Sequence, residues 1–164
     1  MSAIDLLDTS VYLNILNVPG NNQNREDIFA EFEVRVEQGD YFLLPMASIW
    51  ETGNHIANLG NGNLRFQYGQ ELVKDVTRAI NGDTPYRPTH FPSREDFLAW
   101  LADFPEHVQR SKTIKKAREG VSLSDLSIIK EWERNCIRHS MSRVRIWSLD
   151  SDLASYDRQP NCGK

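Results

Sequence analysis

The chain has 164 residues, of which 40% are hydrophobic and 26% are charged, and its formal net charge at pH 7 is −4. Length and composition suit one domain of about 100 to 150 residues with a sizeable core, and they argue against a disordered or repeat protein. The first residues lack the pattern of a signal peptide, and no apolar run approaches the roughly 18 residues that span a bilayer, so we expect a cytoplasmic protein without a membrane partner.

The N-terminal part predicts a strand and two helices. Residues 3–7 form a largely apolar run, and Asp8, Thr9 and Ser10 after it favour the start of a helix that should reach about Asn17. A second, amphipathic helix should then run to Gly39. Its apolar residues keep helical spacing at Ile28, Phe29, Phe32 and Val36.

A second unit of strand and helix follows. The continuous apolar run from Tyr41 to Pro45 predicts a strand that is buried on both faces, and a helix should follow from about Ala47 to Leu59. This alternation is typical of βαβ units around a parallel sheet, whose crossovers are almost always right-handed. The fold class is therefore predicted to be α/β.

The middle of the chain, from Gly60 to about Arg118, contains no convincing strand. Helical patterns occur near 66–80, 93–103 and 106–118, and Ser93 with Asp96 forms a capping-box pattern at the start of the second. We therefore predict a helical insertion over about 60–118.

The C-terminal part predicts one more helix and one more strand. Gly120 ends a helical pattern, and Ser122 or Ser124 starts the next. The buried side of this helix is marked by Ile128, Ile129, Trp132 and Ile137. A third strand should cover 144–149 and stop at Asp150, which gives a single domain over 1–157 and a tail over 158–164.

Four carboxylates stand at the ends of predicted strands or the starts of predicted helices: Asp8, Glu51, Asp125 and Asp150. In an open α/β sheet these places converge, because ligands bind outside the carboxyl ends of the strands. Two unit charges about 4 Å apart repel by roughly 4 kcal/mol at an effective dielectric near 20, so the cluster needs a cation. We expect Mg²⁺ or Mn²⁺, which prefer carboxylate and water oxygens, since the four histidines show no zinc-binding spacing.

The segments around these carboxylates resemble, in order, the four acidic motifs of the PIN-domain family, which includes the VapC-type toxin ribonucleases. The matching segments are residues 6–10, 45–51, 122–129 and 147–153. The resemblance implies a three-layer α/β/α sandwich with a central, mainly parallel sheet. It also implies a metal-dependent endoribonuclease that hydrolyses RNA with Mg²⁺ or Mn²⁺.

The resemblance also assigns roles to residues. The catalytic metal ligands would be Asp8, Glu51, Asp125 and Asp150, with Asp152 as a fifth metal ligand. The family's small hydroxyl positions are matched by Thr9, Ser10 and Ser148, which would hydrogen-bond a carboxylate or the attacking water. RNA would be the main partner, and a cognate antitoxin protein and a homodimer stay open. The long segment between the second and third motifs departs from the compact toxins.

Basic residues gather in the second half of the chain. Residues 1–60 hold two basic residues against nine acidic ones, whereas residues 105–145 hold ten basic against five acidic. The candidates for holding the RNA backbone are Arg110, Lys112, Lys115, Lys116 and Arg118, with Arg134 and Arg138 as further possibilities. A solvated helix face rich in one charge explains the same distribution.

Structural and functional alternatives stay open. Asp8 could simply cap a helix, Glu51 and Asp125 could complete capping boxes with Ser48 and Ser122, and Asp150 or Asp152 could be turn residues. The chain could be a catalytically inactive PIN-like module that binds RNA or a protein. It could also be a phosphatase of the haloacid-dehalogenase type, which requires a second aspartate where Ser10 stands. The four tryptophans are expected in the core rather than stacked on bases.

Overall fold

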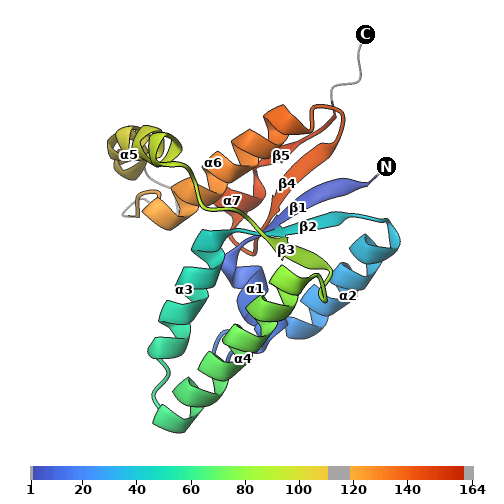
Figure 1. Ribbon diagram of the computed structural model, residues 1–164, viewed down its shortest axis with the longest axis vertical. Helices are drawn as coiled ribbons and strands as arrows, with labels where there is room; N and C mark the ends of the chain where they lie inside the picture. The colour runs from blue at the N-terminus through green and yellow to red at the C-terminus, as the bar shows by residue number, and fades with distance from the viewer. Residues whose placement is uncertain (1, 111–118, 161–164) are drawn as a thin grey trace.

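The computed structural model describes residues 2–110 and 119–160. Over these residues the chain is an α/β protein with a five-stranded, mostly parallel sheet and seven helices (Figure 1). The strands are β1 (Ala3–Leu7), β2 (Tyr41–Leu44), β3 (Tyr86–Pro88), β4 (Arg143–Trp147) and β5 (Asp157–Arg158). The helices are α1 (Thr9–Leu16), α2 (Arg25–Glu37), α3 (Met46–Ala57), α4 (Gly62–Asn81), α5 (Arg94–Gln109), α6 (Leu123–Arg138) and α7 (Ser151–Ala154).

The order of the strands places β1 at the centre of the sheet. The order is β3-β2-β1-β4-β5, and β1 pairs in parallel with both β2 and β4, whereas β5 pairs antiparallel with β4 at one edge. The first three strands therefore lead outward in one direction, and the chain crosses to the other side of β1 for β4. In open α/β sheets such a switch point between neighbouring strands is where ligands bind.

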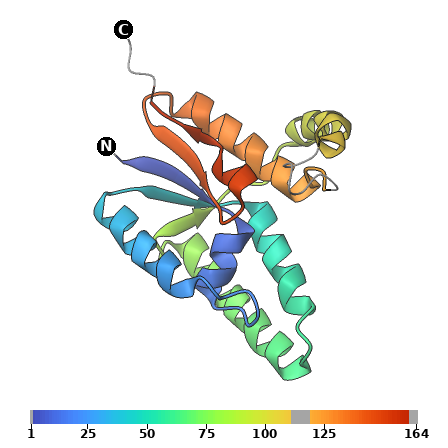
Figure 2. The same cartoon turned by 180° about the vertical axis from the view of Figure 1, so that it is seen from behind.

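Helices cover both faces of the sheet (Figure 2), an arrangement compatible with three layers. Successive strand residues point to opposite faces, so Leu7 packs against α1, α2 and α4, whereas Leu6 packs against α3, α6 and α7. Both leucines are completely buried. The two cores explain why β1 is apolar at nearly every position.

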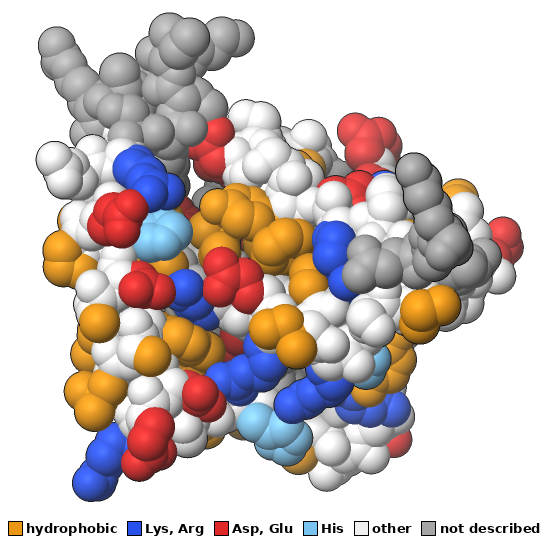
Figure 3. All heavy atoms as spheres, turned by 90° about the horizontal axis from the view of Figure 1, so that it is seen from above, with side chains coloured by type: hydrophobic (Ala, Val, Ile, Leu, Met, Phe, Trp, Pro, Cys, Tyr) orange, Lys and Arg blue, Asp and Glu red, His pale blue; other side chains and the backbone are white. Residues whose placement is uncertain are grey.

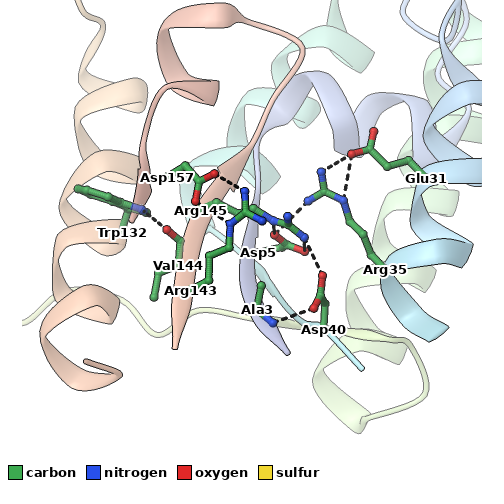
Figure 4. Close-up of polar contacts among 10 residues, drawn as sticks. All are labelled: Ala3, Asp5, Glu31, Arg35, Asp40, Trp132, Arg143, Val144, Arg145 and Asp157. Carbon is green, nitrogen blue, oxygen red and sulfur yellow. Dashed lines mark hydrogen bonds and ion pairs between the residues drawn. The ribbon is translucent and has the colours of Figure 1, made fainter. Parts of the chain in front are cut away.

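The exception is Asp5, which is fully buried in the middle of β1 and is held by arginines (Figure 4). Arg145, its register partner on β4, forms an ion pair with Asp5 and another with Asp40 at 2.7 Å. Arg35 from α2 approaches Asp5 at 3.0 Å and lies 4.2 Å from the centre of the Trp147 ring. This network compensates the buried charge and ties α2, β1 and β4 together.

Three predictions about secondary structure are wrong. The middle of the chain does contain a strand, β3, so the segment 60–118 is not purely a helical insertion. Proline is tolerated in β3 because β3 is an edge strand. A single helix, α5, runs through Pro105 where two helices are predicted, and it is fixed by its Ser93 cap and by buried Trp100.

The third error concerns the buried side of α6. Ile137 is 83% exposed, because Cys136, one residue earlier, takes the inward position at that turn of the helix. The other expected elements are present, with ends within a few residues of those predicted. No helix in the described ranges is long and apolar enough to cross a membrane.

Candidate active site

Asp8 follows β1 directly and caps α1. Its carboxylate is 5% exposed and accepts hydrogen bonds from the backbone N–H of Ser10 at 3.3 Å and from the hydroxyls of Ser10 and Ser148 at 2.7 Å each. Its own N–H donates to the carbonyl of Trp147, the last residue of β4. The carboxylate is therefore fixed at the switch point by hydroxyls from both sides, and its role as a cap is compatible with a further role in a site.

Glu51 lies on α3 beside the same point. It accepts a hydrogen bond from Thr9 Oγ1 at 3.1 Å. Burial raises the pKa of Glu51 above its usual value, although the hydrogen bond from Thr9 lowers it. The negative charges of Asp8 and Asp125 raise this pKa further. Two acidic groups from distant parts of the sequence thus lie close enough to Glu51 to act on it electrostatically.

The capping-box alternative for Glu51 is wrong. The N-cap of α3 is Pro45, and the Ser48 hydroxyl instead donates to the carbonyl of Leu7 at 2.8 Å. Ser48 is fully buried, so this bond joins the first turn of α3 to the last residue of β1. The contact explains why Glu51 lies close to Asp8.

Asp125 and Asp150 begin the helices next to β4. Asp125 is 9% exposed, and its N–H donates to the capping hydroxyl of Ser122 at 3.0 Å. Asp150 caps the short α7 by accepting from the N–H of Asp152 at 2.9 Å. Asp8 thus caps α1, as its alternative expected, and Ser122 caps α6. Asp150, whose alternative was a turn residue, caps α7.

A pocket of about 210 Å³ connects the C-terminal carboxylates. Asp125, Asp150 and Asp152 all line it. Its remaining lining consists of His107, Arg110, Val121, Ile129, Leu153, Ser155 and Tyr156. Since one water occupies roughly 30 Å³ of liquid, the pocket has room for on the order of seven waters, or for a hydrated ion beside a phosphate group.

All five predicted carboxylates therefore gather at the carboxyl ends of β1 and β4. Asp8 and Asp125 both act electrostatically on Glu51, and Asp125, Asp150 and Asp152 line one pocket. The predicted hydroxyls also lie here, since Thr9 binds Glu51 while Ser10 and Ser148 bind Asp8. Residues far apart in the sequence thus share one end of the sheet.

The donor set fits Mg²⁺ or Mn²⁺ in its chemistry. All the donors are carboxylate oxygens, and Asp152 Oδ2 is buried without a hydrogen-bond partner among the described residues. Within those residues, however, no three His, Cys, Asp or Glu side chains are close enough to form a ready-made metal site. Mg²⁺ keeps several waters and binds through one or two carboxylates, so it does not require a closed protein cage.

The predicted RNA-binding residues divide into two groups. Lys112, Lys115, Lys116 and Arg118 lie outside the described residues, as does most of the predicted helix over 106–118. Among the others, Arg110 lines the pocket, and Arg134 pairs with Asp96 at 2.7 Å. Among the described candidates, Arg110 is therefore the basic residue that lines the same pocket as Asp125, Asp150 and Asp152.

Sequence reasoning missed three features of this region. His107 and Tyr156 line the pocket, and no sequence motif predicts their place there. Trp50, one residue before Glu51, is 60% exposed and lies 5.6 Å from the equally exposed ring of Phe91, so the expectation of a core position is wrong for Trp50. Trp100 and Trp147 are buried, as expected.

No protein-family model matches the chain, and comparison with curated proteins gives no match. The function therefore has to be inferred from the site itself.

Proposed function

We propose that this protein is a metal-dependent endoribonuclease of the PIN type, which hydrolyses phosphodiester bonds in RNA with Mg²⁺ or Mn²⁺. The observation that carries the proposal is the gathering of five carboxylates from both ends of the chain at the switch point between β1 and β4. A three-layer PIN-like sandwich is the finer form of the fold that we propose. A cytoplasmic location stays a prediction.

The side chains would have two roles: carboxylates would bind the cation, and hydroxyls would orient the carboxylates. Asp8, Glu51, Asp125, Asp150 and Asp152 would hold the cation, directly or through water. When bound, the cation supplies a water of lowered pKa and neutralises charge on the phosphate. In the hydrolysis the water oxygen forms a bond to phosphorus while the bond from phosphorus to the leaving ribose oxygen breaks.

The hydroxyls would keep the carboxylates in place during the reaction. Ser10 and Ser148 donate to the same oxygen of Asp8, and Thr9 donates to Glu51. These bonds restrict the carboxylates to one orientation, so less reorganisation is needed when a cation and a phosphate enter.

One surface feature favours RNA over a small phosphate ester. Trp50, which precedes Glu51 in the sequence, and Phe91 form an exposed aromatic pair, and a base stacked on such a ring gains about 1–3 kcal/mol. On the face drawn in Figure 3, Lys and Arg side chains are mixed with Asp and Glu side chains, so that face does not favour a polyanion.

The direct test is to incubate purified protein with a set of structured and unstructured RNAs in Mg²⁺, in Mn²⁺ or in a chelator. We expect cleavage by the wild type with either ion, none with the chelator, and none by Asp125→Asn. Asp27→Asn, which removes an exposed charge on α2, is the matched control and should cleave normally. Cleavage that survives chelation or the Asp125 substitution would refute the proposal.

The second candidate is a catalytically inactive module that binds RNA or a protein. It is favoured by the finding that the described carboxylates form no ready-made metal site. In that case the wild type should bind RNA without cutting it in any cation, and Asp125→Asn should leave the affinity unchanged. The same set of samples, analysed by gel and by fluorescence anisotropy, separates the two functions.

A protein partner, whether an antitoxin or a second copy of the chain, also stays a prediction. The outward face of α4 offers a surface for it, because Phe66, Val73 and Ile80 recur every seven residues and are 70%, 67% and 68% exposed. The stripe is symmetrical about Val73, so an antiparallel second copy would place Val73 on a twofold axis. Light scattering tests this: a dimer that Val73→Glu converts to a monomer supports it, and a wild-type monomer at high concentration opposes it.

A further inference from the structure

The helix α5 lies beside the start of α6, at the side of the molecule (Figure 1). Trp100 is 8% exposed, and the guanidinium of Arg134 lies 5.4 Å from its ring while pairing with Asp96 at 2.7 Å. Nearer the C-terminal end of α5, Asp103 pairs with Lys130 of α6 at 2.7 Å. These contacts dock α5 on α6, the helix that also carries Asp125.

The docking brings the end of α5 to the acidic pocket. His107 from its last turn and Arg110, which follows the helix directly, line the same pocket as Asp125, Asp150 and Asp152. Burial raises the pKa of the Tyr156 hydroxyl, and the positive charge of Arg110 opposes that rise, which agrees with Arg110 lying near Tyr156 on the pocket wall. The pocket therefore has carboxylates and a guanidinium within one small volume.

Arg110 can exchange its present partner. It pairs with Glu106 one turn earlier on α5, and the two side chains are 62% and 72% exposed. Exposed pairs of this kind contribute little to stability, whereas an Arg–phosphate contact is charge-assisted and often bidentate. A phosphate that enters the pocket can therefore replace Glu106 at little cost.

Gly120 sets the distance between this turn and the pocket. A Cβ atom at position 120 would overlap the backbone carbonyl of Val108, which lies between His107 and Arg110. Only glycine allows the backbone that leads to Asp125 to pass so close to α5. A side chain at position 120 would push the end of α5 away.

We propose that the C-terminal turn of α5 is a phosphate-binding arm, in which Arg110 and His107 hold the RNA phosphate next to the bond that is cut. This inference rests on the proposed ribonuclease function. A guanidinium and an imidazole are groups that bind phosphate, so the arm is expected to bind the RNA backbone rather than to read a base.

The test compares Arg110→Ala, Arg110→Lys and His107→Ala with Arg94→Ala, a matched control about 24 Å away at the other end of α5. RNA affinity is measured in Mg²⁺ by fluorescence anisotropy over a series of salt concentrations, with an RNA whose phosphodiester bonds resist hydrolysis. For Arg110→Ala we expect about 10-fold weaker binding and a salt slope smaller by about 0.7, the value for one lost single-strand phosphate contact. His107→Ala should weaken binding less, Arg110→Lys should restore part of the affinity, and Arg94→Ala should behave as wild type.

Gly120→Ala provides a second test. We expect weaker RNA binding with unchanged Mn²⁺ affinity, and a thermal unfolding curve identifies the samples that are folded. The inference is overturned if Arg110→Ala and Arg94→Ala bind RNA equally, even when the wild type cleaves with Mg²⁺. If Arg110→Ala weakens binding but the wild type cleaves no RNA in any cation, the arm stands and the ribonuclease function fails.

Discussion

Replacing Glu131 by glutamine should remove a pH dependence from the stability of the protein. Glu131 lies on α6, is 4% exposed and accepts a hydrogen bond from Thr89 Oγ1 at 3.0 Å. Thr89 Oγ1 in turn accepts from the N–H of Met46, the first residue of the helix that carries Glu51. Burial raises the pKa of Glu131 from 4.5 to about 7, against the Thr89 hydrogen bond and the charge of Arg134, which lower it.

The sign and size of the effect follow from this pKa. Because the folded state holds the proton more tightly, the contribution of Glu131 to stability is fully present below pH 4.5 and is lost as the pH rises through about 7. At roughly 1.4 kcal/mol per pH unit, the loss is about 3 kcal/mol. Glutamine, which keeps the shape and an acceptor for Thr89, does not titrate.

Urea denaturation of the wild type and Glu131→Gln between pH 4.5 and 8 measures this loss. The free energy of unfolding of the variant, minus that of the wild type, should increase by about 3 kcal/mol over this range. Glu133→Gln is the matched control, since Glu133 lies on the same helix and its side chain is 45% exposed. Parallel stability curves for the wild type and Glu131→Gln would refute the reasoning.

Three further predictions concern individual side chains. Without metal, Asp8→Ala should lower the free energy of unfolding by about 1–2 kcal/mol and Asp8→Asn by much less, because asparagine also caps helices; urea denaturation that ranks them equally would contradict this. Asp5→Asn should cost about 3–5 kcal/mol, because Arg145 and Arg35 lose a buried partner, and an unchanged melting temperature would show that the network carries no such energy. Trp50→Ala should weaken RNA binding by about 10-fold at an unchanged melting temperature, by loss of stacking, and equal anisotropy curves would oppose a role for this ring.

Much of the fold could be predicted from the sequence, because apolar runs and helical spacing report directly on burial. The run at residues 3–7 gives β1, and the capping residues after it give the start of α1. β3 could not be found in this way, since Tyr86–Pro88 is only three residues long and ends in proline, which normally weakens a strand. Its pairing with β2 is decided by the sheet and not by its own sequence.

The candidate site could likewise be predicted only in part. Asp8, Glu51, Asp125 and Asp150 could be predicted, because strand ends and helix starts meet at one edge of a parallel sheet. His107 could not, because its place at the pocket depends on how α5 docks on α6 and on the close passage of Gly120. Asp5 could not be explained from its own segment either. It is a buried acid in a strand, and its arginine partners come from α2 and β4.

The central claim is that the clustered carboxylates bind a divalent cation. Calorimetric titration of Mn²⁺ into the wild type, Asp125→Asn and Asp27→Asn tests it most directly. A unit charge about 4 Å from another contributes roughly 4 kcal/mol at an effective dielectric near 20, so Asp125→Asn should bind Mn²⁺ far more weakly than the wild type, and Asp27→Asn should match the wild type. Equal binding by all three proteins, or no binding by the wild type, would contradict the claim.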